Sequence, residues 1–492
     1  MTAEIRMESK SIKINFVYQT IYRVITILTP LITSPIISRA LGAEKLGVFS
    51  ASLAFVSFFR LFCLLGIEHY GCRSIATAQG ERKKQASIFW NLYAIQVVAG
   101  TLSIVAYTIA CFYLPGERIV ISVLQGLWLV GALLDINWFF FGTEQFRLTV
   151  IRNIIIKIIS LLLIVSFVKK PEDIYIYVII LGGDTVLTNI AIWPFLKRFI
   201  SFERPRLSIM RGHIKPILVL FVPIFAMSVF HIMDKSMLDW LSTEKNVGYY
   251  YTADKVISIP LSIITGLNTV MLPRVSNEYS KGKTAQVEKM LKSTTEITTF
   301  LACAIGFGLA AVAKPFVPWF FGKEYEVCVQ LVYVFIPVFF VKSIGSLVRS
   351  QFMIPSGMDW QFTVSVCIGA ATNLVFNYVL IRRYQAIGAV LGTLAAETVV
   401  TTMQLFFTRR RIRFVRYILA QIPYFIFGVF MLLTVKLVKE VLSGTVVIQL
   451  LCSILIGALV YCILCVLYWV ISKNSYFNGN KYIKKLRLKN YS

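Results

Sequence analysis

The amino-acid sequence predicts an all-α polytopic membrane protein with about fourteen transmembrane helices. Hydrophobic residues make up 57% of the 492-residue chain, its mean hydropathy is +0.73, and only 15% of its residues are charged. A soluble domain is about 45–50% apolar and about 25% charged. Apolar runs of about 18 or more residues recur along the whole chain, and each can cross a hydrocarbon core of about 30 Å. The runs are continuous rather than alternating, which indicates helices and not a β-barrel.

Each predicted span is a long apolar run between short polar loops. The first run follows a polar segment, is too long for a signal peptide and lacks a small-residue cleavage site, so we expect it to remain as a span. In chain order the predicted spans cover residues 14–39, 46–68, 86–113, 118–140, 148–168, 174–196, 215–240, 247–272, 293–314, 327–348, 360–381, 386–407, 415–437 and 446–471.

The start of the chain is repeated near its middle, in TPLITSPIISRALGAEKLGVFSAS and VPIFAMSVFHIMDKSMLDWLSTEKNVGYYYTAD. Both copies have an internal proline, a loop with Glu-Lys, and a glycine (Gly47 or Gly248) that opens the next span beside an aromatic residue. The offset is about 200 residues, or six spans, as in parallel repeats. This predicts two pseudo-symmetric six-helix lobes, 1–200 and 201–412, then two helices in 413–472 and a basic cytoplasmic tail in 473–492. Chance similarity of two apolar stretches is the alternative.

The formal net charge of +26 is explained by topology rather than by nucleic acid. Basic residues gather in alternate loops, for example at 82–84, 281–289 and 409–413. Cytoplasmic loops of membrane proteins collect lysine and arginine. The pattern therefore predicts that both termini are cytoplasmic, in agreement with an even number of spans.

The sequence carries no pattern that points to an enzyme, a metal site or a cofactor. The nine cysteines are scattered through apolar segments, which is not a disulfide framework. The three histidines are isolated, so they lack metal-ligand spacing. The chain contains no P-loop, no Ser-His-Asp arrangement and no paired carboxylates. We therefore expect no cofactor and no metal.

Three predicted spans carry polar side chains along one helical face. The positions are Asn15, Gln19, Tyr22, Thr26, Thr29 and Thr33 with Arg23 in the first span, Ser57, Arg60 and Glu68 in the second, and Asp254, Ser258, Ser262, Thr265 and Thr269 with Lys255 in the eighth. Hydrogen bonds between packed helices would explain the serines and threonines. A hydrated cavity explains the cations better, since an arginine or lysine at mid-membrane costs about 2.5–3.5 kcal/mol or more.

A cationic cavity suits an anionic substrate, because arginine pairs with phosphate oxygens and lysine acts as a point charge. The substrate-binding candidates are Arg23, Arg60, Lys255, Asp254 and Gln19. Near the outer end of the seventh span, Asp234 and Lys235 could pair with neighbouring residues, gate the outer mouth or bind a coupling ion. Together with Glu68 they are the candidates for gating or ion coupling.

The chain resembles the Wzx-type polysaccharide flippases of the multidrug/oligosaccharidyl-lipid/polysaccharide exporter superfamily. The resemblance covers about three quarters of the chain and is weakest in the last two spans. It lies in the order and spacing of SPIISRALGAEKLGVFS, LLGIEHYGCRSIA, WFFFGTEQFRLTVIRNIIIKIISLLLIVSFVKKPEDIYIY, MDKSMLDWLSTEKNVGYYYTADKV, VMLPRVSNEYS, IPSGMDWQFTVSVCIGAATNLVFNYVLI and GAVLGTLAAE.

The resemblance implies fourteen helices in two six-helix lobes around a central cavity. It implies a flippase that moves oligosaccharides linked to undecaprenyl diphosphate across the bacterial plasma membrane by alternating access, for a surface polysaccharide such as O-antigen or capsule. Lipid II flippases, a related branch, keep cavity-facing arginines in their first two helices, where Arg23 and Arg60 have comparable places.

The implied partners are the lipid-linked oligosaccharide, membrane lipids, and a polysaccharide polymerase with its chain-length regulator. Two alternatives remain open. A cation-coupled drug antiporter of the same superfamily would need acidic rather than basic groups in its cavity. A membrane-embedded glycan polymerase would need a long outer loop or an intramembrane catalytic histidine.

Overall fold

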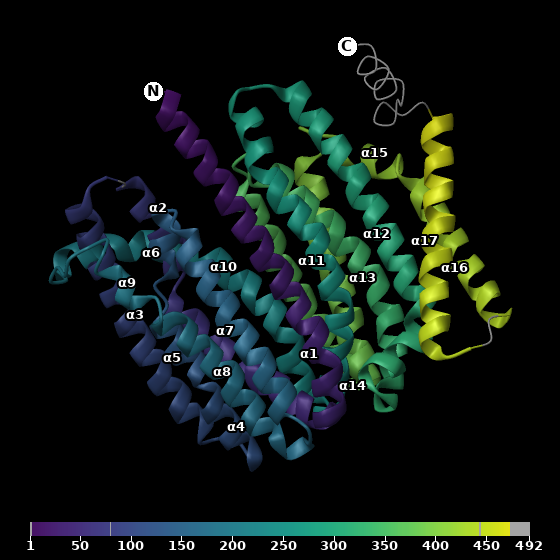
Figure 1. The fold of residues 1–492 in the computed structure, drawn as a ribbon, viewed down its shortest axis with the longest axis horizontal. Coiled ribbons are helices and arrows are strands. Elements are labelled where there is room, and N and C mark those ends of the chain that lie inside the picture. The colour runs from purple at the N-terminus through teal and green to yellow at the C-terminus, as the bar shows by residue number, and fades with distance from the viewer. Residues whose placement is uncertain (1, 79, 442–443, 473–492) are drawn as a thin grey trace. The chain divides into compact units, whose positions relative to one another are not determined.

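The structure is a computed structural model that describes residues 2–78, 80–441 and 444–472, without the side chains of residues 2–24, 146–147, 231 and 441. In this part of the chain the regular structure is helical throughout (Figure 1). The helices are α1 Thr2–Leu64, α2 Ile67–Thr77, α3 Arg82–Cys111, α4 Glu117–Gln125, α5 Leu127–Leu133, α6 Asn137–Gly142, α7 Phe146–Phe167, α8 Ile174–Ile190, α9 Trp193–Leu196, α10 Leu207–Leu241, α11 Glu244–Ser280, α12 Thr284–Phe321, α13 Cys328–Val348, α14 Asp359–Thr408, α15 Phe414–Leu419, α16 Ile422–Val441 and α17 Val446–Ile471. Short 3₁₀ or π turns lie at Pro171–Asp173, Lys323–Val327 and Arg349–Met353.

The prediction of an all-α membrane protein is confirmed. Twelve stretches of the described residues are long and apolar enough to cross a membrane. Two of them contain two helices each, because α1 is interrupted at Gly42 (φ 72°) and α14 at Gln385 (φ 51°). These interruptions lie between the spans predicted at 14–39 and 46–68, and between those at 360–381 and 386–407. The count of fourteen spans and the cytoplasmic placement of both termini stay predictions.

The span predicted at 118–140 is divided into α4, α5 and the start of α6. A break in a membrane helix leaves backbone groups that lipid cannot satisfy. Here side chains of neighbouring helices satisfy them. Gln96 Nε2 donates to the carbonyl oxygens of Ala132 and Asp135, both at 2.9 Å, and Trp193 Nε1 donates to that of Leu134 at 3.0 Å. Asn189 adds a bond to the carbonyl oxygen of Gly131 at 2.8 Å, so the break is built into the fold.

The chain divides into two compact units. Unit 1 comprises 1–259, 320–331 and 363–400, and unit 2 comprises 260–319, 332–362 and 401–492. In unit 1 an aromatic cluster around Phe89, Trp138 and Phe139 packs α3 against α6. In unit 2, α16 packs against α17 (Figure 1), and the buried Tyr461 and Tyr424 contact Phe300 of α12. The predicted lobe boundaries stay predictions.

Many large apolar side chains point away from both units, as expected for helices in lipid. Leu102, Leu162, Leu437 and Leu455 are each 60–67% exposed. Polar residues such as Asn91, Gln96 and Asn373 are buried instead, at 1% exposed or less. Apolar side chains outside and polar side chains inside are expected in lipid, which cannot form hydrogen bonds. The arrangement is typical of a multi-pass membrane protein.

Candidate functional site

Arg60 lines a cavity of about 350 Å³ in unit 1. The walls come from the end of α1, the start of α2 and the middle of α10. Glu68 and His69 of α2 share this cavity, as do Ser57 of α1 and Ser228 of α10. The structure therefore brings together two of the candidates from the sequence, Arg60 and Glu68. A guanidinium beside small hydroxyls in a membrane cavity can bind an anion.

Gln19 and Arg23 lie on the first part of α1, and their side chains fall outside the described part of the structure. Their assignment to the substrate site stays a prediction.

Lys255 and Asp254 of α11 form a second charged cluster in unit 1, together with Lys235 of α10. Lys235 Nζ lies 3.5 Å from Asp254 Oδ2. The ammonium groups of Lys235 and Lys255 lie 5.2 Å and 4.3 Å from the centre of the Tyr251 ring. Such cation–π contacts hold a cation in place at a partly desolvated site. The cluster has two lysines and one carboxylate, so it also offers positive charge to an anion.

Asp234 has different surroundings from its neighbour Lys235. Its carboxylate is 5% exposed and accepts four hydrogen bonds. Tyr250 and Thr393 donate their hydroxyl protons to Oδ2 at 2.8 and 2.7 Å, and the Nδ2 atoms of Asn373 and Asn377 lie 2.8 and 2.7 Å from Oδ1. The donors come from α11 and from both halves of α14, so one carboxylate joins four helical segments. All four donors are neutral.

This network has a further acceptor. Asn377 Oδ1 is buried and has no hydrogen-bond donor among the described residues. The oxygen and nitrogen of an asparagine amide are assigned from the bonds they make, so turning the amides of Asn373 and Asn377 would direct two carbonyl oxygens toward the carboxylate. A carboxylate, amide oxygens and hydroxyl oxygens are hard ligands suited to a small cation. The network can therefore hold a cation or a proton.

Sequence reasoning identified Asp234 but not its partners. Asn373 and Asn377 are four residues apart in an apolar span, which places both amides on one helical face. That spacing was a usable signal. Thr393 gave no such signal, because a single threonine in a membrane helix commonly bonds to the backbone of the same helix.

At the start of α11, close to Tyr250, the helix crosses α1 with almost no space between the two backbones. A Cβ atom added to Gly47 would lie 1.7 Å from the Glu244 carbonyl oxygen, and one added to Gly248 would lie 1.8 Å from that of Ala43. The Cβ added to Gly47 would also lie 3.1 Å from the Gly248 backbone nitrogen, and the Cβ added to Gly248 would lie 3.1 Å from the Gly47 nitrogen. The two contacts join matching positions of the two copies of the repeat. This correspondence supports the repeat. The helices close this end of unit 1 by direct backbone contact.

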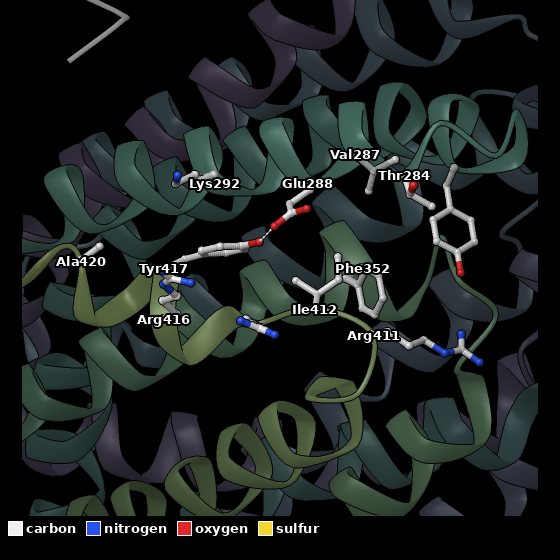
Figure 2. Close-up of a pocket in the computed structure, with 12 residues that line it drawn as sticks. Thr284, Val287, Glu288, Lys292, Phe352, Arg411, Ile412, Arg416, Tyr417 and Ala420 are labelled. Atoms are coloured by element: carbon white, nitrogen blue, oxygen red, sulfur yellow. Dashed lines mark hydrogen bonds between the residues drawn. The ribbon is translucent and has the colours of Figure 1, made fainter. Parts of the chain in front are cut away.

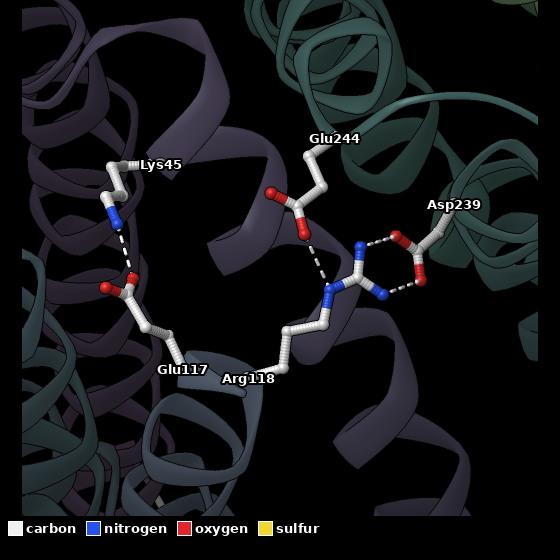
Figure 3. Close-up of polar contacts among 5 residues, drawn as sticks. All are labelled: Lys45, Glu117, Arg118, Asp239 and Glu244. Atoms are coloured by element: carbon white, nitrogen blue, oxygen red, sulfur yellow. Dashed lines mark hydrogen bonds and ion pairs between the residues drawn. The ribbon is translucent and has the colours of Figure 1, made fainter. Parts of the chain in front are cut away.

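Ion pairs surround this crossing (Figure 3). Arg118 of α4 binds both oxygens of Asp239 at 3.0 and 2.6 Å and donates from Nε to Glu244 at 2.7 Å. Lys45 of α1 pairs with Glu117 of α4. Arg118 is 22% exposed, so its forked interaction with two carboxylates is shielded from water. Arg118 thus ties α4 to the end of α10 and the start of α11.

Glu324 makes a comparable contact on the opposite side of the crossing. Its Oε2 accepts a bond from the backbone nitrogen of Ala43 at 3.3 Å, and its Oε1 lies 3.6 Å from Lys245 Nζ. Ala43 is equivalent to Glu244 in the repeat, so Arg118 and Glu324 bind equivalent positions with opposite charge. Neither Arg118 nor Glu324 was identified from the sequence, because the role of each depends on how α1 and α11 cross. We call this set of contacts, made by Lys45, Glu117, Arg118, Asp239, Glu244, Lys245 and Glu324, the latch.

Replacing Arg118 by glutamine is expected to weaken the closed arrangement of this end. The change removes three charge-assisted bonds and leaves two carboxylates close together. A loss of even about 1.4 kcal/mol raises the open population about tenfold. Cys328 can report it, because this thiol is fully buried and lies 3.5 Å from the Tyr249 carbonyl oxygen. In a protein with Cys328 as its single cysteine, the rate of labelling by a membrane-impermeant thiol reagent should rise about tenfold.

Lys245→Gln is the matched control for this experiment. Lys245 and Glu324 are 50% and 41% exposed, and exposed ion pairs contribute about 0–1 kcal/mol. An equal increase in Cys328 labelling in both variants would contradict the proposed importance of Arg118.

The family described as polysaccharide biosynthesis protein matches residues 12–279, more than half of this chain. The chain belongs to this family. The match includes Arg60, Asp234 and the glycine crossing. The resemblance found in the sequence motifs is therefore confirmed for this polysaccharide biosynthesis protein.

Two relatives of described function are similar to this chain over half of its length or more. A protein of Escherichia coli described as "Putative O-antigen transporter" is 23% identical over 411 residues, which cover 81% of this chain and 97% of that protein. A protein of Haloferax volcanii described as a "Probable low-salt glycan biosynthesis flippase" is 23% identical over 249 residues, which cover 50% of this chain and 52% of that protein.

Among solved structures, "Lipid II flippase MurJ, inward closed conformation" is similar to this polysaccharide biosynthesis protein with a TM-score of 0.72. The sequences are 14% identical, and the similarity covers 94% of this chain and 100% of the other. This likeness shows that the two chains share a transporter fold.

Proposed function

We propose that this protein is a flippase that moves undecaprenyl-diphosphate-linked oligosaccharide units across the plasma membrane for the synthesis of a cell-surface polysaccharide. The observation that carries the proposal is the similarity to an O-antigen transporter over 97% of that protein, within a polysaccharide biosynthesis family. A transporter, and not an enzyme, also fits the chemistry of the site, since its charged groups can bind an anion and a cation.

Arg60 is proposed to bind the diphosphate, together with Arg23, which precedes the break of α1 at Gly42. Each guanidinium can form two parallel charge-assisted bonds to phosphate oxygens, which are stronger than bonds between neutral groups. Lys255 adds a point charge, while Gln19 and Asp254 offer hydrogen bonds to sugar hydroxyls. Glu68 shares the cavity with Arg60 and is proposed to release the guanidinium from the phosphate when the cavity opens.

The Asp234 network is proposed to couple transport to a cation. A buried carboxylate surrounded by neutral donors keeps one negative charge that a small cation or a proton can neutralise. Because the carboxylate joins α10, α11 and both halves of α14, cation binding would change how these segments pack. Lys235, which pairs with Asp254, is proposed to gate rather than to bind the ion.

Alternating access is proposed to proceed by rocking of the lobes 1–200 and 201–412. The latch would close the outer end, which is the end opposite the basic loops. Residues 413–472 and the basic tail 473–492 would lie outside the lobes.

A polysaccharide polymerase and a chain-length regulator are the proposed downstream partners, since the translocated units must be joined. The basic cavity disfavours the drug antiporter, and no observation favours a glycan polymerase.

The test is the double variant Arg23→Ala, Arg60→Ala. Each lost arginine–phosphate contact contributes about 1.5–3 kcal/mol, so transport should fall about a hundredfold or more. The measurement is the amount of surface glycan per cell, with the amount of protein in the membrane determined in parallel. The double variant Arg82→Ala, Lys83→Ala removes the same charge from exposed positions and should keep normal glycan. Normal glycan in the first variant at normal protein level would rule out this site.

A further inference from the structure

Unit 2 contains a cavity of about 930 Å³ that is separate from the Arg60 cavity and from the Asp234 network. It lies where α11 ends and α12 begins, and where α14 ends and α15 begins. All these helix ends belong to apolar segments that can cross a membrane. The cavity is therefore at the level where helices enter or leave the bilayer, on the side of the basic loops.

Four cationic side chains line this cavity. Lys292 lies on α12, Arg411 and Arg413 lie in the linker before α15, and Arg416 lies on α15. Glu288 is the acid among the described lining residues. Figure 2 shows Glu288 and Tyr417 pointing toward one another across the cavity, and the Tyr417 hydroxyl donates to the carboxylate. The lining thus carries an excess of positive charge.

The floor of the cavity is apolar and buried. Phe352 and Val287 are 2% exposed and belong to a buried cluster that also contains Phe414 and Tyr417. The rings of Phe352 and Phe414 have their centres 5.9 Å apart, nearly perpendicular. A cavity with an apolar floor and several cationic groups in its lining is suited to a small amphipathic anion. An anion bound in this cavity would gain Coulomb energy from the excess positive charge of its lining.

We propose that this cavity binds the phosphate of an anionic phospholipid from the leaflet on the side of the basic loops. Phosphate oxygens match the guanidinium fork of Arg411, Arg413 and Arg416, and Lys292 supplies a point charge. The apolar floor fits the glycerol and the first methylenes of the acyl chains. Tyrosines at the membrane interface, here Tyr279 and Tyr417, have one polar and one apolar end and suit this depth.

A phosphate group could also come from a soluble compound, and the location of the cavity decides between the two sources. A soluble anion would need neither an apolar floor nor a position at helix ends. A lipid needs both. Basic pockets between transmembrane helices are a general mode of anionic headgroup recognition.

The experiment uses the full-length protein in detergent and measures thermal stabilisation on addition of phosphatidylglycerol, phosphatidylcholine or sodium phosphate. Wild type should be stabilised by phosphatidylglycerol at concentrations about tenfold or more below those needed for phosphatidylcholine. The double variant Arg411→Gln, Arg416→Gln should need about tenfold or more phosphatidylglycerol for the same shift. Arg409→Gln, Arg410→Gln removes the same charge from the same linker without touching the lining, and it should behave as wild type.

Glu288→Gln provides an effect of opposite sign. Removal of the acid should lower the phosphatidylglycerol concentration required several-fold, which a destabilised protein would not show. Equal responses to the two lipids, or equal losses in the two arginine variants, would overturn the proposal. Stabilisation by sodium phosphate alone, lost in Arg411→Gln, Arg416→Gln, would overturn the lipid assignment. No transport is measured, so the result is independent of the flippase function.

Discussion

Replacing Gly248 by alanine is expected to prevent closure of the outer end and to abolish transport. An added Cβ would lie 1.8 Å from the Ala43 carbonyl oxygen, and Cβ contacts below about 3.0 Å do not occur in real structures. The atom that it meets belongs to the backbone, so no side chain can move aside. The helices α1 and α11 must therefore separate by more than an ångström, which breaks the bonds of the latch as well.

The measurements are surface glycan per cell and the labelling rate of Cys328, which should rise well beyond the change seen in Arg118→Gln. Gly183→Ala and Gly212→Ala are matched controls, because a Cβ at either position meets no atom within 4 Å. In a helix the alanine is even favoured over glycine by about 1 kcal/mol. The equivalent variant Gly47→Ala should reproduce the phenotype. Normal glycan and slow labelling in Gly248→Ala would show that the crossing does not close the protein.

Asp234→Asn is expected to remove coupling of transport to the cation and to stop net translocation. The substitution keeps the shape of the side chain but removes its charge. It also replaces one carboxylate oxygen by an amide NH₂, so the two donors bonded to that oxygen lose their acceptor, at a cost of about 1–3 kcal/mol each. The protein should therefore reach the membrane at a reduced but measurable level. At that level, surface glycan should fall about a hundredfold or more, because the cation has lost its only negatively charged ligand in the described network.

A purely structural role for Asp234 predicts a different outcome, namely reduced protein with normal transport per molecule. The readout that separates the two is thermal stabilisation of purified protein by NaCl relative to choline chloride, at several pH values. Asp184→Asn is the control, since Asp184 is a membrane-embedded acid that lies 3.7 Å from Lys157 and far along the chain from the network. Sodium-dependent or pH-dependent stabilisation that persists unchanged in Asp234→Asn would contradict the coupling role.

The helices and the polar faces could be predicted from the sequence because both are local properties. A run of apolar residues forms a helix in lipid whatever surrounds it, and its polar positions then share a face. The predicted break between 14–39 and 46–68 appears at Gly42, and Arg60 and Glu68 of neighbouring helices share one cavity. Asp184 is paired in the same local way, because Lys157 and Ser160 of the preceding helix contact it.

Interactions between distant segments could not be predicted in the same way. The role of Arg118 arises only because α10 ends and α11 begins within reach of it. Asn373, Asn377 and Thr393 are more than a hundred residues from Asp234 along the chain. Their importance follows from the fold-back of α14 at Gln385, which the order of residues does not specify.

The two sides of the latch differ in strength, so salt is expected to weaken one side of the α1–α11 crossing more than the other. Arg118 is held by two partly buried carboxylates, whereas Glu324 is held by one backbone amide and an exposed lysine. Added salt screens the exposed pair first. The Glu324 side is therefore weakened at lower salt than the Arg118 side, which contributes most to closure. Two identical halves would make contacts of equal strength on both sides of the α1–α11 crossing. Divergence of the two copies therefore makes the closure asymmetric, with one strong side and one weak side.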